Sequence, residues 1–325
     1  MADDFDSQGS SRLKQYMKPS KDCAAVTIAY HPKPELLVGQ LQVLCGKVAR
    51  LIVVDNGGTL SESDFSDVPE QVDLLRPGEN LGVAGGQNLG IERARNAGCR
   101  YVLLMDQDSL PEANMVDELW KTLEYLQGQN IRAGAVGPYI ADYRGRPGRS
   151  APFAKATSLW YRYGEIRSGQ QAAEEVAYLL DSGSLIRLDV LKEAGNKLEE
   201  LFIDYVDIEW YFRARQKGYR FFVAPAARMK HALGTLTKKR LGPITVHLIQ
   251  HEPFRYYYIY RNSILIMRLR TIPLGWKLFT FMVRFVLRGP ELMFHDSPRA
   301  KLRMAARGTW AGMRGRTGRF EENPA

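Results

Sequence analysis

Residues 101–108 of the chain are Tyr-Val-Leu-Leu-Met-Asp-Gln-Asp, an apolar run that ends in two carboxylates. Continuous apolar runs of this kind are typical of strands buried on both faces of a parallel sheet. Comparable runs lie at residues 24–30, 51–54, 72–75 and 133–138, and segments with helical spacing separate them. Because strands and helices alternate, the sequence predicts an α/β fold with a mostly parallel sheet flanked by helices.

The segments between and after these strands complete the expected unit. Helices are expected at residues 34–47, 86–98 and 111–127. Residues 142–175 are rich in Arg, Gly and Ser, and we expect a mobile loop there. Beyond it, the patterns predict extended segments at 176–180 and 184–187, helices at 189–195 and 205–217, and a closing strand at 219–223.

The charge of the chain is unevenly distributed. Residues 211–320 hold 23 Lys or Arg and three acids, whereas the rest of the 325 residues hold 22 basic and 33 acidic residues. This asymmetry predicts an acidic part that performs metal chemistry and a basic part that faces anions. We therefore expect a flexible leader at 1–22, a catalytic domain at 23–240 and a basic, aromatic region at 241–325 that is helical beyond about residue 245.

The C-terminal region has the composition of a membrane-surface segment. Aromatic and basic residues are mixed at 254–262 and 276–288, and residues 297–320 contain seven basic residues and no acid. Such stretches suit the headgroup boundary of anionic lipid, although helices packed on the catalytic domain would have a similar pattern. Nucleic acid would also fit the charge, but no nucleic-acid motif is present, and we expect no nucleic-acid partner.

The location of the protein follows from several absences in the sequence. The first ten residues, MADDFDSQGS, are unlike a secretory signal, and no run of about 18 uninterrupted apolar residues occurs. The three cysteines are scattered, which favours a reducing compartment. We expect a cytoplasmic protein held peripherally on the inner face of the cell membrane.

Two carboxylates at the end of the fourth expected strand, at 101–105, are candidates for a metal site. Asp106 and Asp108 are one residue apart, and ligands of open α/β sheets bind at the carboxyl ends of strands. Oxygen ligands suit Mg²⁺ or Mn²⁺, which commonly share a substrate diphosphate. The alternative is a solvated turn that caps the helix expected to begin near Pro111.

The first half of the chain also predicts a nucleotide pocket. Asp55 ends the second strand, where it could accept a hydrogen bond from a base or ribose, or simply form the Asp-Asn-Gly turn. The glycine-rich stretch 80–90 would let a ligand approach the backbone closely and opens a helix whose N-terminus favours anions. It lacks the spacing of the dinucleotide fingerprint, which argues against a nicotinamide enzyme.

A second acidic cluster lies at residues 204–210. Asp207 and Glu209 would diverge by about 200° on a helix, so that one can face a pocket while the other pairs with Arg213. A carboxylate in a partly buried cleft can act as a general base, although acids are also common at helix N-termini. His231 could complete a metal site with Asp108, or be structural.

Taken together and in order, these segments resemble the family 2 inverting glycosyltransferases, in particular the bacterial rhamnosyltransferases. The resemblance covers about residues 23–235. Its motifs are Thr-Ile-Ala-Tyr-His-Pro at 27–32, Val-Val-Asp-Asn at 53–56, Asn-Leu-Gly at 80–82, Asp-Gln-Asp at 106–108, Leu-Asp-Ser-Gly at 180–183 and Phe-Ile-Asp-Tyr-Val-Asp-Ile-Glu-Trp at 202–210.

The resemblance implies a GT-A fold, with a Rossmann-like sheet, and a role for each matching residue. It implies that Asp207 is the catalytic base and that a Mg²⁺ or Mn²⁺ ion is bound by Asp106, Asp108 and His231, with Asp108 the direct ligand. It also implies that the base and ribose of the nucleotide sugar contact Tyr30 and Asp55. The full set of residues implied to bind the nucleotide sugar is Tyr30, Asp55, Asn56, Asn80, Gly82, Asn88 and Asp106.

The implied reaction is transfer of a sugar with inversion. The favoured donor is dTDP-L-rhamnose and the acceptor a saccharide or lipid-linked saccharide of a cell-surface polysaccharide such as lipopolysaccharide. Many family members have Glu-Asp where this chain has Val206-Asp207, so Asp204 remains a rival base. Other donors (a UDP-hexose or UDP-galactofuranose), a nucleotidyltransferase and a non-catalytic binding module are the alternatives.

Overall fold

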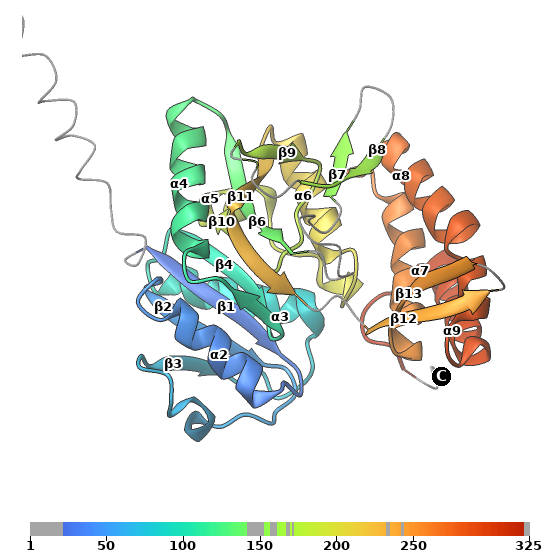
Figure 1. The fold of residues 1–325 in the computed structure, drawn as a ribbon, viewed down its shortest axis with the longest axis horizontal. Coiled ribbons are helices and arrows are strands. Elements are labelled where there is room, and N and C mark those ends of the chain that lie inside the picture. The colour runs from blue at the N-terminus through green and yellow to red at the C-terminus, as the bar shows by residue number, and fades with distance from the viewer. Residues whose placement is uncertain are drawn as a thin grey trace, which may run out of the picture.

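The computed structural model describes residues 22–141, 153–156, 161–166, 170, 172–231, 235–241 and 244–321. Within them, a nine-stranded sheet has the order β3-β2-β1-β4-β10-β6-β11-β5, with β9 paired to β11 (Figure 1). The expected leader at 1–22 lies outside the described residues, apart from Asp22.

One half of the sheet is parallel, as the apolar runs predicted. It consists of β1 (Cys23–Ala29), β2 (Arg50–Asp55), β3 (Val72–Leu75) and β4 (Tyr101–Asp106). Its connections contain α2 (Pro34–Leu44), η2 (Glu62–Phe65) and α3 (Gly82–Asn96). All four strands end at the same edge of the sheet, and Asp106 is the last residue of β4, which borders the other half.

The other half of the sheet is mixed. Here β10 (Ser184–Arg187) runs antiparallel between β4 and β6 (Ala133–Ile140), and β11 (Arg220–His231) is parallel to β6. Two short strands, β5 (Ser109–Pro111) and β9 (Glu174–Val176), pair antiparallel with β11. The helical elements of this half are α4 (Met115–Gly128), α5 (Leu188–Ala194), η3 (Glu199–Leu201) and α6 (Val206–Gln216).

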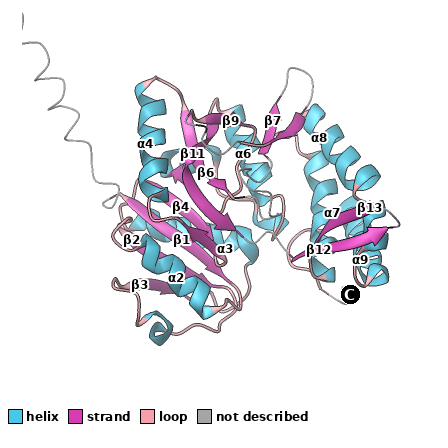
Figure 2. Ribbon diagram, viewed as in Figure 1, coloured by secondary structure: helices cyan, strands magenta, loops and turns pink. Residues whose placement is uncertain are grey.

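Helices cover both faces of the sheet because its strands are apolar on both sides (Figure 2). In β1, Val26 and Ile28 belong to one core with the α3 residue Ile91, whereas Ala25 belongs to another with Leu41 of α2. The alternation follows from the two-residue period of a strand, which points successive side chains to opposite faces. The α/β fold predicted from the sequence is therefore confirmed.

Three sequence predictions need correction. The closing strand does not end at residue 223: β11 continues to His231, and its pairing with β6 resumes at Arg228 after an irregularity that begins at Ala224. The region 142–175 is not simply a loop, since it contains the hairpin of β7 (Phe153–Ala156) and β8 (Tyr161–Gly164), and also β9. The helix expected from residue 111 begins at Met115, after β5, so Asp108 does not cap it.

A hairpin and a group of helices follow the sheet. The hairpin, β12 (Thr235–Leu241) with β13 (Ile244–Gln250), was not expected from the sequence, which placed helices beyond about residue 245. The helices are α7 (Pro253–Arg268), α8 (Leu274–Phe281), η4 (Met282–Leu287), η5 (Pro290–Phe294) and α9 (Pro298–Met313). None of the helices in the described part of the chain has the length and apolarity needed to cross a bilayer.

Candidate active site

A cleft of about 1070 Å³ lies at the carboxyl ends of the strands. One wall comes from the sheet, the loops that follow its strands and the start of α6, and includes Asn56, Asp106, Asp181 and Asp207. The opposite wall comes from α7, α8, η4 and η5 of the C-terminal region. The cleft is thus shared between the two parts of the chain that differ in charge, with carboxylates and arginines facing the same space.

Three predicted metal ligands meet in this cleft. Carboxylate oxygens of Asp106 and Asp108 lie 3.6 Å and 3.5 Å from the His231 ring nitrogens Nε2 and Nδ1, respectively. Ligand atoms of all three residues lie within 4.8 Å of one another. The strand pairing explains the meeting, because β5 and β11 place His231 directly opposite Ser109, the residue after the Asp-Gln-Asp turn.

Hydrogen bonds hold this cluster in position. The Ser109 hydroxyl lies 2.7 Å from His231 Nδ1 and 2.6 Å from the hydroxyl of Ser182, which accepts a hydrogen bond from the Asp106 N–H at 3.0 Å. Burial raises the pKa of Asp106; His231 opposes the shift and Asp108 adds to it. Two close carboxylates and an imidazole suit a divalent cation, which would relieve the repulsion between the acids.

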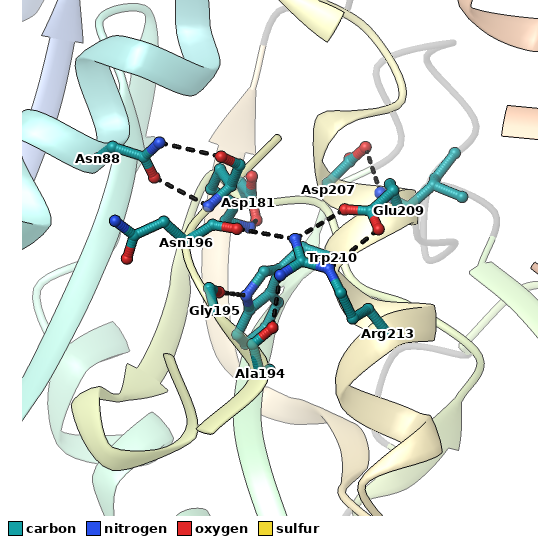
Figure 3. Close-up of polar contacts among 11 residues, drawn as sticks. Asn88, Asp181, Ala194, Gly195, Asn196, Asp207, Glu209, Trp210 and Arg213 are labelled. Carbon is teal, nitrogen blue, oxygen red and sulfur yellow. Dashed lines mark hydrogen bonds and ion pairs between the residues drawn. The ribbon is translucent and has the colours of Figure 1, made fainter. Parts of the chain in front are cut away.

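Asp207 lies in the first turn of α6 and lines the same cleft. Its carboxylate accepts a hydrogen bond from the N–H of Ile208 at 2.8 Å (Figure 3). Burial, and then the negative charge of Asp181, raise the pKa of Asp207 to about 7. A carboxyl group with this pKa accepts protons near neutral pH far better than an ordinary aspartate.

The other acid of the helix, Glu209, has a different task. It is buried and pairs with Arg213 at 2.8 Å, as the sequence predicted. Arg213 also donates to the carbonyls of Ala194 and Asn196, and the Trp210 indole donates to the carbonyl of Gly195 (Figure 3). These contacts hold α6 against the end of α5 and the two residues that follow it, and so fix the helix that carries Asp207.

The loop before α6 has an unusual backbone. Phe202, Asp204 and Tyr205 all have positive φ values, of 64°, 65° and 67°. Each such residue costs about 1–3 kcal/mol and persists only when its surroundings impose it. The constraint comes from α7: the side-chain amide of Asn262 donates to the carbonyls of Leu201, Ile203 and Asp204 at 2.8, 2.7 and 3.0 Å.

Arg261 adds to the hydrogen bonds by which Asn262 holds the loop at 201–204, an arrangement we call the clamp. Its guanidinium donates to the carbonyl of Leu201 at 2.9 Å and to the Asn262 side-chain oxygen at 2.9 Å, and the residue is fully buried. Arg255, also on α7, pairs with Asp204 at 3.0 Å. Asp204, the rival base, is therefore engaged by a guanidinium, whereas no cationic side chain in the described residues pairs with Asp207.

Replacing Asn262 by Ala is expected to lower turnover more than it lowers donor binding. The loss of three donated hydrogen bonds frees the loop that orients Asp207, and we expect turnover to fall about 10- to 100-fold because misplaced catalytic groups lose rate steeply. The free energy of unfolding should fall by about 1–3 kcal/mol. Steady-state kinetics and thermal unfolding check both effects.

The matched control is Asn114→Ala, because Asn114 is exposed and its side chain makes no capping bond with α4. It should leave both quantities unchanged. Equal donor affinity and equal turnover in Asn262→Ala and the parent protein would contradict a positioning role.

The predicted nucleotide contacts divide into two groups. Tyr30, Asn56, Asn80 and Gly82 line the cleft. Asn56 donates to the carbonyl of Gly82 at 2.8 Å, and the Asn80 side-chain oxygen accepts the Gly82 N–H at 2.9 Å. Gly82 is required at this point, since its φ is +71° and a Cβ would lie 2.5 Å from the carbonyl oxygen of Phe202.

Asp55 and Asn88 are not among the residues that line the cleft. Of the two roles that the sequence allowed for Asp55, the structure shows the turn. Its carboxylate accepts hydrogen bonds from the N–H groups of Gly57 and Leu60 at 3.1 and 2.8 Å. Asn88 exchanges hydrogen bonds with the backbone of Lys197 at 2.9 and 3.0 Å and ties α3 to the segment after α5. Their contacts with a nucleotide stay predictions.

One expectation for the glycine-rich stretch is wrong in this structure. The N-terminus of α3 is not open to an anion, because the Phe202 carbonyl accepts the N–H groups of Val83 and Ala84 at 2.7 and 3.3 Å. Phe202 is itself one of the positive-φ residues of the loop before α6, so these hydrogen bonds join α3 directly to that loop.

Sequence reasoning missed several residues of the cleft. Asp181 was quoted only as part of a motif, yet it lines the cleft and pairs with the buried Lys197 at 2.6 Å. Arg255, Arg284 and Asn262 were seen only as members of a basic, aromatic region. The available signal was the pair Arg261-Asn262 inside an otherwise apolar helical stretch. Because buried polar groups need hydrogen-bond partners, such a pair predicts a contact with another segment.

The chain matches the model of the "Glycosyltransferase like family 2" family over residues 48–251. It is 30% identical to the dTDP-rhamnosyl transferase RfbF of Shigella flexneri, over 77% of this chain and 81% of that protein. It is 26% identical to the galactofuranosyltransferase GlfT1 of Mycobacterium tuberculosis H37Rv, over 72% of this chain and 79% of that protein.

Solved structures show the same fold at low sequence identity. The crystal structure of GalNAc-T7 with UDP, GalNAc and Mn²⁺ has a TM-score of 0.52 and 12% identity; the match covers 87% of this chain and 59% of that chain. The S. aureus TarS 1–349 complex with UDP-GlcNAc also has a TM-score of 0.52 and 12% identity, over 92% and 94% of the chains. The predicted GT-A fold is confirmed, and by its family match over residues 48–251 and its relationship to RfbF the chain belongs to the family 2-like glycosyltransferases.

Proposed function

We propose that the protein transfers L-rhamnose from dTDP-L-rhamnose, with inversion, to a saccharide or lipid-linked saccharide acceptor of a cell-surface polysaccharide. The observation that carries the proposal is the common cleft of Asp108, His231 and Asp207, residues far apart in the sequence. A cation site beside a carboxylate of raised pKa provides both parts of the reaction: stabilisation of a leaving diphosphate and removal of a proton.

The reaction is a single displacement. The Asp207 carboxylate accepts the proton of the acceptor hydroxyl, whose oxygen forms a bond to the anomeric carbon while the bond from that carbon to the diphosphate oxygen breaks. Attack opposite the leaving group inverts the anomeric centre. A Mg²⁺ or Mn²⁺ ion held by Asp106, Asp108 and His231 would neutralise charge on the departing diphosphate.

Arg255 is placed to assist on the leaving-group side. Asp204, at 3.0 Å, is the main cause of its raised pKa, and Asp106 and Asp108 contribute as well. The guanidinium therefore pairs with the loop before α6 and shares the cleft with the carboxylates of the cation site. A permanent positive charge there favours the dianionic product of bond cleavage.

The preference for dTDP-L-rhamnose is supported by the 30% identity to the Shigella dTDP-rhamnosyl transferase. UDP-galactofuranose is the second candidate donor, on the strength of the 26% identity to GlfT1. Transfer at the inner face of the cell membrane belongs to the same proposal, supported by the seven basic residues and absence of acids at 297–320.

A thermal-shift panel of nucleotide sugars tests the donor. With Mn²⁺ present, dTDP-L-rhamnose at about 100 times its dissociation constant should add about 2.7 kcal/mol to the free energy of unfolding, while UDP-galactofuranose and UDP-glucose at equal concentration add far less. The same panel with EDTA in place of Mn²⁺ is the control and should show a smaller shift. Stabilisation by UDP-sugars alone would reject the rhamnosyl donor, and no stabilisation by any nucleotide sugar would reject the function.

A further inference from the structure

An unusual concentration of exposed apolar side chains lies in α8, η4 and η5. Of the fifteen large hydrophobic residues that are exposed in the described part of the chain, eight lie between residues 274 and 294. Leu274, Met293 and Leu287 are 70, 65 and 59% exposed. Isolated exposed apolar residues are ordinary, but a cluster of this density on one short segment marks an interaction surface.

The exposed residues share one side of a helix. α8 and η4 follow each other without a break from Leu274 to Leu287. Their exposed apolar positions, separated by four, three, one and four residues, repeat at helical spacing: Leu274, Leu278, Phe281, Met282 and Val286. We call this set the outer face of α8–η4.

The opposite side of the same helix forms a wall of the active-site cleft. Trp276, Phe279, Thr280, Val283 and Arg284 all line the cleft. Trp276 packs edge-on against Tyr205 with the ring centroids 6.3 Å apart, and Arg284 donates to the Tyr205 hydroxyl at 3.4 Å. One helix therefore separates the outer face from the residues beside Asp207.

Positive charge accompanies the outer face. Arg268 and Arg270 near the end of α7, Arg288 after η4, and Arg299 and Arg303 of α9 are exposed, whereas Arg255, Arg261 and Arg284 are engaged in the cleft or buried and do not contribute. α9 adds the exposed Trp310, with the Arg314 guanidinium 4.5 Å from its ring centroid. Figure 1 shows α8 and α9 together on the side of the molecule opposite β3.

We propose that the outer face of α8–η4 docks onto an anionic lipid bilayer and thereby brings the cleft to the acceptor. Apolar side chains enter the acyl boundary while the surrounding Lys and Arg contact the headgroups. A helix with its side chains is about 10–12 Å thick, so the cleft lies within about that distance of the lipid. The acceptor class this favours is a saccharide carried on a membrane lipid, a conclusion that rests on the proposed function.

A bilayer fits this surface better than a second copy of the chain. A symmetric dimer through the outer face would place the same basic region of each copy against the other, and like charges across an interface are unfavourable. An anionic lipid surface instead complements both the apolar face and its basic surroundings.

Vesicle co-sedimentation of the full chain tests the docking, without any sugar substrate. Vesicles of phosphatidylglycerol and phosphatidylcholine should bind the protein, and phosphatidylcholine alone should bind it at least about tenfold less, because each basic residue near an anionic surface adds about 1 kcal/mol. The variant Leu278→Glu with Phe281→Glu should bind the mixed vesicles at least about tenfold more weakly, since charged groups do not enter the acyl boundary.

The control variant is Tyr125→Glu, which makes the same kind of change at a side chain of α4 that is 66% exposed. It should bind vesicles like the parent protein. Equal vesicle binding by the double variant and the parent would overturn the proposal. The proposal would also be overturned if the parent protein did not bind anionic vesicles but self-associated in analytical ultracentrifugation, and the double variant remained monomeric.

Failure of this docking and failure of the proposed function can be told apart. The double variant should keep the parent's thermal shift with nucleotide sugar, because Leu278 and Phe281 do not line the cleft. Loss of vesicle binding with an intact donor shift supports the docking surface. A parent protein that binds vesicles but no nucleotide sugar would refute the function and leave the lipid contact standing.

Discussion

Replacing Asp207 by Asn is expected to lower the turnover number about 10²- to 10⁴-fold, the range that a positioned general base contributes. Asn has the shape of Asp but cannot accept the acceptor proton. Donor affinity should stay nearly the same, because the base acts on the acceptor. The variant should be at least as stable as the parent, since burial opposes the charge of Asp207 and raises its pKa to about 7.

The pH profile gives an independent check of the same residue. Because the raised pKa leaves Asp207 partly protonated at neutral pH, kcat/KM of the parent enzyme should increase with pH up to about 7 and then level off. Asp204→Asn is the matched variant and should retain far more activity, since Asp204 is bound to Arg255. Normal turnover by Asp207→Asn, or a larger loss in Asp204→Asn, would reassign the base.

Replacing Asp108 by Asn should reduce turnover about 10²- to 10³-fold, comparable with the loss of one preorganised group at a developing negative charge. The change removes one of two carboxylates from a cluster whose third member, His231, lies 3.5 Å away. The additional thermal stabilisation that Mn²⁺ gives in the presence of dTDP should also disappear, because the cation and the diphosphate bind together.

Asp117→Asn is the control for this prediction. It makes the same substitution at an α4 carboxylate that pairs with Lys47 and is not among the residues that line the cleft. Its turnover should change by less than about twofold, as surface ion pairs contribute little. A variant of Asp108 that keeps full Mn²⁺-dependent activity would exclude the cluster as the metal site.

The sequence predicted those features that depend on local pattern. Buried parallel strands have an unmistakable apolar run, and the run at 101–105 is followed by the acidic residues that reach the cleft. The separation of Asp207 from Glu209 followed from helical geometry alone, and the pairing of Glu209 with Arg213 was correctly predicted. The resemblance to the family 2 glycosyltransferases was confirmed by the family match over residues 48–251.

The features that were missed depend on contacts between distant segments. Nothing local reveals that β11 continues past Pro225, since its last part is stabilised by pairing with β5. The clamp of Asn262 on the loop at 201–204 joins residues about sixty positions apart, and its three carbonyl acceptors carry no sequence signal. The turn made by Asp55 could not be distinguished from a ligand contact, because both use the same carboxylate oxygens.

A crystal structure of the protein with Mn²⁺ and dTDP, with anomalous scattering recorded at the manganese edge, tests the central claim most directly. We predict one strong manganese peak bound by Asp108 and His231 and in contact with the diphosphate, in the cleft that Asp207 lines. A manganese peak elsewhere, or a nucleotide bound outside this cleft, would contradict the account.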